Sequence, residues 1–315
     1  MGSGVVLDLT IVIVNWNTSE LLFQCLNSIY STSTRFSFEV IVVDNGSRDD
    51  SVSMLENKFP AVILIKNAQN FGFAHANNQG LSIARGRYFL LLNSDTIVLP
   101  NVFDMLVQTA DEHPELGAVG PEILNLDGTV QESWASFPSL LSELLGRNFR
   151  VRQPVADVPC AYDVDWIMGA CMLVRTQTVA DVGMLDDDYF FYAEEMDWCF
   201  RIKKHNWKIW YITNAQIYHL GGGSSHRSSL PQLCLLYKGK LLYFRKHHGK
   251  LKTFLLRYGF ALGNALGVAR RIVFFNWIGR KIALQRIMDQ SKLVWYLLRD
   301  RYPNLTASPS IDRAS

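Results

Sequence analysis

The chain has 315 residues, 49% hydrophobic and 19% charged, which is enough for one large domain or for one domain with an appendage. Its five cysteines are scattered, odd in number and without a Cys-x-x-Cys pair, so they suggest neither a zinc knuckle nor a disulfide framework and fit a reducing compartment. The net charge of +2 is unevenly distributed: residues 1–229 hold 15 basic and 26 acidic side chains, whereas residues 230–302 hold 15 basic and only two acidic ones.

Strands and helices are predicted to alternate through the first part of the chain. Short apolar runs rich in β-branched residues predict strands at 9–14, 39–43, 62–65 and 88–92. Amphipathic spacing and polar starts predict helices at 18–30, with Thr18 or Ser19 as its cap, and at 51–57, 76–84 and 101–111. Such alternation favours an α/β fold of Rossmann type, with a mostly parallel sheet covered on both faces.

The pattern is less regular between residues 122 and 164, where Asp127-Gly128 is a turn signal that could close a hairpin. Beyond it we expect a strand at 166–174, a helix at 194–205 and a strand at 208–211. A glycine-rich segment, 221–225, follows and is either a linker or a loop that closes over a ligand. We expect a nucleotide-binding domain at 5–228, a basic helical region at 229–302 and a flexible tail at 303–315.

Polar residues sit where three of the predicted strands end. The first strand is followed by Asn15-Trp16-Asn17, the second by Asp44-Asn45-Gly46-Ser47 and the fourth by Asn93-Ser94-Asp95. Ligands of an open parallel sheet bind beyond the carboxyl ends of its strands, so this pattern predicts a ligand site. The turn after the first strand contains no glycine, which argues against a dinucleotide-binding fingerprint and hydride transfer.

Asp95 closes a predicted buried strand. A carboxylate there must be paired, hydrogen-bonded or bound to a metal, because burial of an isolated charge costs about 3 kcal/mol or more. Its spacing is wrong for capping the helix that begins near residue 101. Mg²⁺ and Mn²⁺ prefer oxygen ligands and commonly lie between carboxylates and substrate phosphates, so Asp95 is a candidate metal ligand.

A second acidic group, Glu194-Glu195-Met196-Asp197, opens a predicted helix between aromatic flanks. Acids are favoured at a helix N-terminus by the macrodipole, which is the simpler explanation. The apolar setting also favours a raised pKa and a general-base role. Asp197 is expected to pair with Arg201, four residues on.

These motifs together resemble glycosyltransferase family 2, a group of inverting sugar transferases with the GT-A fold. The resemblance covers about residues 8–225, and the members it resembles most are bacterial rhamnosyltransferases of surface-polysaccharide synthesis. It rests on six ordered segments of the chain: 11–17, 42–47, 70–74 with Asn77 and Gly80, 91–95, 166–170 and 190–201. It implies a GT-A-like domain that binds a nucleotide sugar.

The resemblance also implies roles for individual residues. Asp44 would bind the nucleotide base, and the other nucleotide contacts would come from Asn15, Asn17, Asn70, Gly72, Asn77, Asn93 and Ser94. Asp95 and His219 would hold Mg²⁺ or Mn²⁺ on the diphosphate, although a lone histidine is by itself more typical of a structural role. Trp166 and Gly169 would contact the acceptor.

Two departures from the family pattern stand out. The family's Asp-x-Asp motif is Asn93-Ser94-Asp95 here, and an amide is a weak metal ligand. The family's Glu-Asp pair is Glu194-Glu195, so either glutamate could be the general base; we favour Glu195.

The predicted reaction is an inverting transfer of L-rhamnose from dTDP-rhamnose onto a lipid-linked glycan of the bacterial cell envelope. A UDP-hexose or UDP-N-acetylhexosamine donor is the alternative within the same chemistry. A non-catalytic nucleotide-sugar binding membrane scaffold is the alternative of another class. The presence of both Asp95 and Glu195 argues against that scaffold.

In residues 230–302, Lys and Arg are interleaved with Leu, Phe, Trp and Tyr. This pattern is typical of helices that lie on anionic lipid, so we expect a peripheral protein on the cytoplasmic face of the inner or plasma membrane. Its apolar runs, 254–269 and 272–278, are too short or too charged to predict a membrane span. Nucleic acid is disfavoured as a partner because no nucleic-acid motif occurs, and an ordinary helical subdomain remains the alternative. The sequence predicts no oligomeric state.

Overall fold

The computed structural model describes residues 7–146, 151–221, 230–273 and 280–299. The chain divides into two compact units. Among the described residues, unit one comprises 7–137, 151–190 and 194–221. Unit two comprises 138–146, 191–193, 230–273 and 280–299. Of the glycine-rich segment predicted at 221–225, only Gly221 lies within the described residues.

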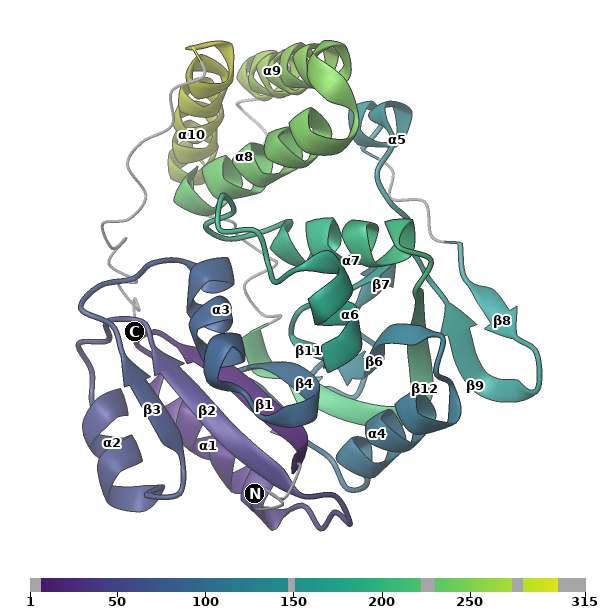
Figure 1. Ribbon diagram of the computed structural model, residues 1–315. Helices are drawn as coiled ribbons and strands as arrows, with labels where there is room; N and C mark the ends of the chain where they lie inside the picture. Colours follow the sequence, from purple (N-terminus) through teal and green to yellow (C-terminus); the bar gives the residue numbers. More distant parts are fainter. Residues whose placement is uncertain (1–6, 147–150, 222–229, 274–279, 300–315) are drawn as a thin grey trace. The chain divides into compact units, whose positions relative to one another are not determined.

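Unit one is built on a ten-stranded sheet (Figure 1). Its strands are β1 (Leu7–Asn15), β2 (Phe38–Asp44), β3 (Ile63–Lys66), β4 (Gly86–Asn93), β5 (Thr96–Val98), β6 (Leu116–Leu124), β8 (Gln153–Val155), β9 (Val158–Asp163), β11 (Cys171–Arg175) and β12 (Lys208–His219). The spatial order is β3-β2-β1-β4-β11-β6-β12-β9-β8, and β5 pairs with β12. The first four strands in this order are parallel, whereas β11 runs antiparallel to both of its neighbours.

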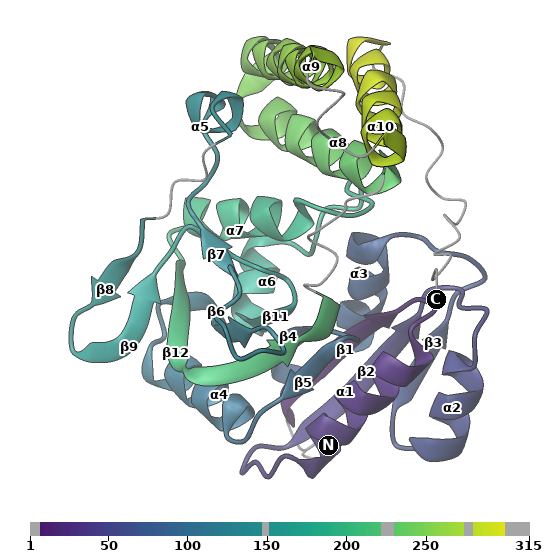
Figure 2. The ribbon, with the colours of Figure 1, turned by 180° about the vertical axis from the view of Figure 1, so that it is seen from behind.

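Helices cover both faces of this sheet, as the two opposite views in Figures 1 and 2 show. They are α1 (Ser19–Ser31), α2 (Ser51–Lys58), α3 (Phe73–Ile83), α4 (Val102–Glu112), α6 (Thr176–Val182) and α7 (Glu194–Lys204). Successive residues of a strand point to opposite faces. Accordingly, Ile11 and Ile13 lie in the core formed with α1 and α4, whereas Val12 lies in the core formed with α3, α6 and α7. The predicted α/β fold with a mostly parallel sheet is confirmed.

The prediction of one strand at 166–174 is wrong. The segment forms two short strands in different sheets: β10 (Trp166–Ile167) pairs with β7 (Trp134–Ala135), and β11 belongs to the large sheet. The chain crosses between the sheets at residues 168–170, where Met168 N donates to Ser133 O. Apolar content predicts burial at both strands but does not reveal this change of sheet.

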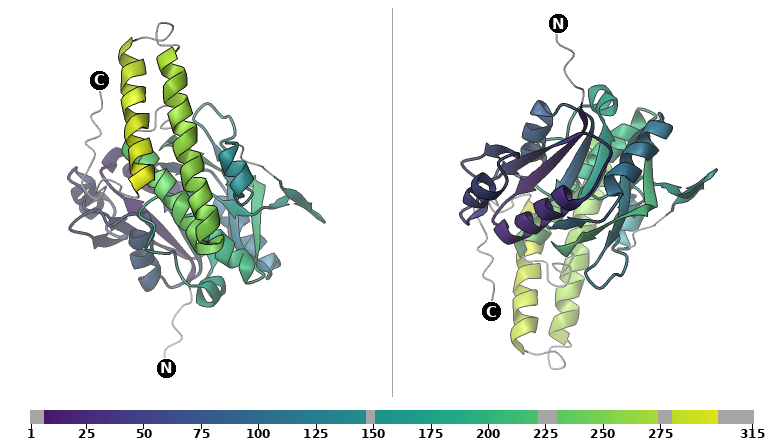
Figure 3. Two further views of the ribbon diagram at one scale, coloured as in Figure 1. Left: turned by 90° about the horizontal axis from the view of Figure 1, so that it is seen from above. Right: turned by 90° about the horizontal axis from the view of Figure 1, so that it is seen from below.

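Unit two contains α5 (Leu140–Leu144), α8 (Leu230–His247), α9 (Gly249–Val273) and α10 (Arg280–Arg299). Figure 3 shows α9 and α10 lying alongside each other. Lys240 of α8 pairs with Glu143 of α5 at 2.7 Å, and Asn264 Nδ2 of α9 donates to the Tyr237 hydroxyl of α8 at 3.1 Å. Within the described part of the chain, no helix has both the length and the apolar character needed to cross a bilayer.

Candidate active site

The ends of β1 and β2 hold two buried polar residues side by side. Asn15 and Asp44 are opposite each other in the parallel register. The Asn15 amide donates to Asp44 Oδ1 at 3.0 Å and to Ser47 Oγ at 3.2 Å, while Ser47 N donates to Asp44 Oδ2 at 2.9 Å. The structure therefore brings these two predicted nucleotide-binding residues together in a fixed orientation.

A further hydrogen-bond chain links this pair to the end of β4. The Thr18 hydroxyl donates to Asn15 Oδ1 at 2.7 Å and lies 3.0 Å from Ser94 Oγ. Thr18 occupies the N-cap position of α1 but makes no capping hydrogen bond with its side chain. Asn17 beside it has a left-handed backbone (φ 54°), and its Oδ1 accepts from Arg48 N at 2.7 Å. The sequence offered Thr18 only as a helix cap, so its role as a link was missed.

The loop before α3 is held by Asn45, another residue without a predicted role. Its buried amide donates to Asn70 Oδ1 at 2.9 Å and to Gly72 O at 3.1 Å. Gly72 has φ 92°, and a Cβ there would lie 2.5 Å from Phe190 O, so only glycine fits. The predicted residues Asn70 and Gly72 thus belong to one fixed loop whose signal in the sequence was the polar end of β2.

Two other predicted site residues bind the protein's own backbone. Asn77 is 1% exposed, and its amide donates to Phe73 O at 2.9 Å within α3. The Trp166 indole donates to Ser136 O at 3.3 Å. Both hydrogen bonds hold the surrounding segments in place.

Asp95 and His219 face each other because β5 pairs with the end of β12, where Thr96 lies opposite His219. His219 Nε2 lies 3.2 Å from Asp95 Oδ1 and 3.3 Å from Asn93 Nδ2. The Asp95 backbone oxygen accepts from Leu220 N at 2.7 Å. The two predicted metal ligands are therefore neighbours in the structure.

This pair of side chains suits a divalent cation. One carboxylate oxygen and one imidazole nitrogen converge, and their side chains are 21% and 11% exposed, so the pair is accessible. Mn²⁺ accepts such ligands, and Mg²⁺ and Mn²⁺ commonly take their remaining ligands from phosphates and water. The described residues contain no group of three or more His, Cys, Asp or Glu side chains that could hold a metal. A cation held by Asp95 and His219 would therefore need further ligands from a bound diphosphate.

Glu194 and Glu195 begin α7 and adjoin the same segment that touches β4. A Cβ on Gly169 would lie 3.6 Å from Glu195 Cβ. The next residue, Ala170, accepts a hydrogen bond from Asn93 N at 3.0 Å. Residues 169 and 170 therefore connect the acid pair with the end of β4, two residues before the candidate metal ligand Asp95.

Burial is the main influence on the pKa values of Glu194 and Glu195. It raises the pKa of Glu194 well above the usual value, and the neighbouring charge of Glu195 raises it further. Burial also raises the pKa of Glu195, opposed by hydrogen bonds from backbone N–H groups at the start of α7 and from the Glu194 side chain. In each side chain, Oε2 is buried and has no hydrogen-bond partner in the protein. A buried carboxyl with a free oxygen is the type of group that serves as a general base.

The backbone that leads into this pair is strained. Tyr192 and Ala193 both have left-handed conformations, with φ 71° and 72°, which bulky side chains rarely adopt. Such strain concentrates at functional sites.

The ion pair predicted between Asp197 and Arg201 is confirmed, with Nε and Oδ2 2.8 Å apart.

The raised pKa of Glu194 predicts how stability depends on pH. A carboxyl whose folded-state pKa is raised contributes stability that is full below its usual value of 4.5 and is lost as pH rises through the folded-state pKa. Because glutamine does not ionise, Glu194→Gln removes this pH-dependent loss of stability. Urea unfolding at about pH 5 and about pH 8 should show the variant gaining stability relative to the wild-type protein at the higher pH. The exposed substitution Glu56→Gln should not, and parallel behaviour of Glu194→Gln and wild type would contradict the burial argument.

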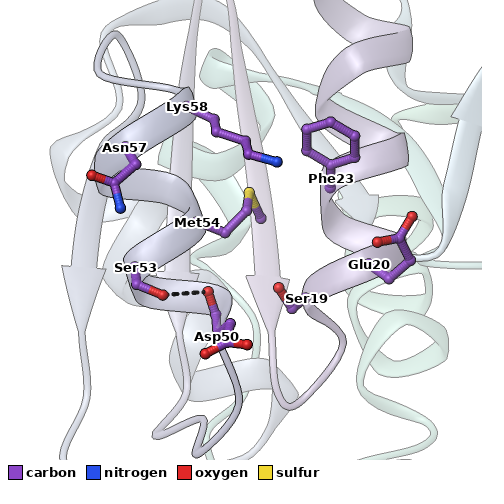
Figure 4. A pocket seen from close by; sticks show the side chains of 8 residues that line it. All are labelled: Ser19, Glu20, Phe23, Asp50, Ser53, Met54, Asn57 and Lys58. Carbon is purple, nitrogen blue, oxygen red and sulfur yellow. Dashed lines mark hydrogen bonds between the residues drawn. The ribbon is translucent and has the colours of Figure 1, made fainter.

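A pocket of about 290 Å³ lies between α1 and α2 (Figure 4). Ser53 Oγ on its wall donates to Asp50 O at 3.0 Å. It is lined by Ser19, Glu20, Phe23, Asp50, Ser53, Met54, Asn57 and Lys58. None of the predicted site residues lines it, so we assign the chemistry to the strand ends and not to this pocket.

Comparison with known sequences agrees with the geometry. Residues 10–183 match the family model "Glycosyl transferase family 2". The chain is 28% identical over 262 residues to N-acetylglucosaminyl-diphospho-decaprenol L-rhamnosyltransferase of Mycobacterium tuberculosis, covering 76% of this chain and 85% of that protein. It is 27% identical to the low-salt glycan biosynthesis hexosyltransferase Agl10 of Haloferax volcanii, over 64% of each chain.

Comparison with solved structures identifies the fold. The mannosyltransferase PcManGT of Pyrobaculum calidifontis, in complex with GDP-Man and Mn²⁺, superposes with a TM-score of 0.58 at 16% identity, covering 94% of this chain and 88% of that one. GalNAc-T7 with UDP, GalNAc and Mn²⁺ gives a TM-score of 0.57 at 14% identity, covering 77% of this chain and 50% of that one. These likenesses establish a GT-A fold.

Proposed function

The chain belongs to glycosyl transferase family 2 and is a glycosyltransferase, and we propose that it moves L-rhamnose from dTDP-rhamnose onto a lipid-linked glycan in cell-surface polysaccharide synthesis. The observation that carries this proposal is the short path from the buried acid pair to the Asp95–His219 pair through residues 169 and 170. A single displacement at a sugar carbon needs a proton acceptor and a diphosphate site that face the same sugar. The rhamnosyl donor and the lipid-linked acceptor are proposed from the named activity of the mycobacterial relative.

In the proposed reaction, the strand-end network around Asn15 and Asp44 binds the nucleotide. Asp95 and His219 would hold a divalent cation, which neutralises charge on the departing diphosphate. Glu195 removes the proton from an acceptor hydroxyl as that oxygen bonds to the anomeric carbon. The bond from this carbon to the diphosphate oxygen breaks, the configuration inverts, and the proton remains on Glu195.

The coupling of the two buried carboxyls favours one of them as the base. Burial raises the pKa of both Glu194 and Glu195, and the two side chains hydrogen-bond to each other. In a coupled pair, one carboxyl therefore keeps its proton while the other ionises. We assign the ionised member, which can accept a proton, to Glu195, because it occupies the base position of the family's Glu-Asp pair.

A thermal-shift screen tests the donor. We expect dTDP with Mn²⁺, and then dTDP-rhamnose, to stabilise the chain more than UDP, GDP or their sugars. At a hundred times its dissociation constant, a ligand stabilises the chain by about 2.7 kcal/mol over the unliganded protein. If UDP-hexose or UDP-N-acetylhexosamine stabilises the chain more than dTDP-rhamnose, that sugar nucleotide would be the donor instead. Stabilisation by none of the nucleotides would contradict the proposed function.

Unit two supports a proposed contact with anionic lipid. Six large apolar side chains of α9 are 44–72% exposed: Leu251, Phe254, Leu255, Tyr258, Leu262 and Leu266. Their spacing of three, four and seven residues places them on one side of the helix. Exposed lysines and arginines lie near both ends, at Lys250, Lys252 and Arg270. Such a face suits a helix lying in the membrane interface, which would bring the enzyme to a lipid-linked acceptor.

The double substitution Phe254→Glu/Leu262→Glu should weaken co-sedimentation with anionic liposomes by about tenfold or more, since each buried side chain of this size contributes roughly 1.5–3 kcal/mol. The control Ile83→Glu/Met184→Glu changes exposed apolar residues of unit one and should have little effect. Unchanged co-sedimentation of the α9 variant would contradict the interfacial role of this face.

A further inference from the structure

The hairpin after β6 places a glutamine beside the candidate metal site. Gly128 at its turn has φ 80°, Val130 pairs with Leu124, and Gln131 N donates to Ile123 O at 2.7 Å. Gln131 Oε1 thereby lies 2.7 Å from His219 Nδ1. This ring nitrogen is the one that faces away from Asp95.

Hydrogen bonds within the hairpin fix the orientation of the Gln131 amide. They begin at the Asp127 carboxylate, which only accepts, and whose pKa is lowered by hydrogen bonds from Thr129. The Thr129 hydroxyl donates to Asp127 Oδ1 at 2.6 Å, so its oxygen accepts from Asn125 Nδ2 at 2.9 Å. Asn125 Oδ1 then accepts from Gln131 Nε2 at 3.0 Å. The oxygen of Gln131 is therefore the atom that faces His219.

An amide oxygen can only accept, so His219 Nδ1 must carry the ring hydrogen. In the neutral ring, Nε2 then carries a lone pair, which agrees with its contact to the donor Asn93 Nδ2 at 3.3 Å. It also faces Asp95 Oδ1 at 3.2 Å. His219 Nε2 and Asp95 Oδ1 are then two lone-pair donors with no hydrogen between them, and a divalent cation could bind to both.

We propose that Gln131 is a positioning residue for metal binding, holding His219 in the tautomer whose Nε2 can coordinate a divalent cation. The proposal rests on the metal role of Asp95 and His219 in the proposed function. Without the Gln131 oxygen, the ring would place its hydrogen on Nε2 and donate it to Asp95. The two candidate ligands would then be hydrogen-bonded to each other instead of free to bind a cation. Hydrogen bonds to the second nitrogen of a metal-binding histidine commonly serve this purpose.

The same argument gives a reason for Asn93. An aspartate at this position would present an acceptor to His219 Nε2 and so favour a hydrogen on that nitrogen. The amide presents a donor, which favours the lone pair. Asn93 and Gln131 therefore act on the two ring nitrogens in the same direction.

Gln131→Met tests the proposal, because methionine keeps the length of the side chain and removes the oxygen. In ¹⁵N NMR of the full chain, His219 should carry its hydrogen on Nδ1 in the wild-type protein and on Nε2 in the variant. Mn²⁺ affinity, measured by electron paramagnetic resonance with saturating dTDP, should fall about 10- to 100-fold. The control Gln216→Met, on the same strand as His219, removes an amide that donates to Glu122 and should change neither readout.

His219→Ala separates this inference from the function on which it rests. If His219→Ala binds Mn²⁺ as tightly as the wild-type protein, the metal role in the proposed function fails. If His219→Ala loses affinity while Gln131→Met keeps both its affinity and the Nδ1–H tautomer, only the positioning role of Gln131 is overturned.

Discussion

Glu195→Gln is expected to abolish sugar transfer while leaving donor binding intact. The amide has nearly the same shape as the carboxyl group but cannot accept a proton, so the loss should match a general base, about 100- to 10,000-fold in kcat. Because Glu195 lies against Gly169 and not among the strand-end residues, the nucleotide site should remain as it is. Single-turnover transfer and equilibrium binding of the donor measure the two properties separately.

Glu194→Gln is the informative comparison. If Glu195 is the base, Glu194→Gln should lower the rate less, since it removes only a neighbour. The opposite ranking would assign the base to Glu194 and decide the alternative left open by the sequence. Turnover of Glu195→Gln at the wild-type rate would place the base outside the pair. The exposed control Glu56→Gln should transfer normally.

Removal of divalent metal should have a comparably large effect. A departing diphosphate gathers negative charge that a bound cation neutralises. Two side-chain ligands leave the cation exchangeable, so EDTA should suppress transfer and added Mn²⁺ or Mg²⁺ should restore it. Asp95→Asn should reduce transfer at limiting Mn²⁺, because an amide oxygen is a weaker ligand than a carboxylate.

Asp157→Asn is a matched control for that substitution. Asp157 is exposed between β8 and β9 and has a left-handed backbone (φ 65°) that asparagine also tolerates. The control should keep the wild-type dependence on Mn²⁺. Transfer that is indifferent to chelation would remove the metal role from Asp95 and His219.

The strand-end residues were predictable because parallel strands bring their carboxyl ends to one edge of the sheet. Once β1 and β2 are adjacent and in register, Asn15 must lie opposite Asp44. The meeting of Asp95 with His219 required more. It depends on β12 running to residue 219, well beyond the strand predicted at 208–211, and on its pairing with β5. Here only the family resemblance pointed to His219.

Other features were beyond reach of local patterns because their partners lie far along the chain. Thr18 is a normal helix-starting residue until β4 brings Ser94 to within 3.0 Å of it. Asn45 organises a loop some 25 residues later. Gln131 had a usable signal in the Asp127-Gly128 turn, which predicts that the chain doubles back beside β6. Its contact with His219 still depends on the tertiary placement of β12.

The central claim is tested most directly by a transfer assay with the full chain, Mn²⁺, dTDP-rhamnose and a polyprenyl-diphosphate carrying N-acetylglucosamine. Mass spectrometry of the lipid product measures sugar addition. We predict a lipid extended by one rhamnose with the wild-type chain and none with Glu195→Gln. A wild-type chain that binds nucleotide sugars but extends the lipid with none of the donors in the screen would contradict the account.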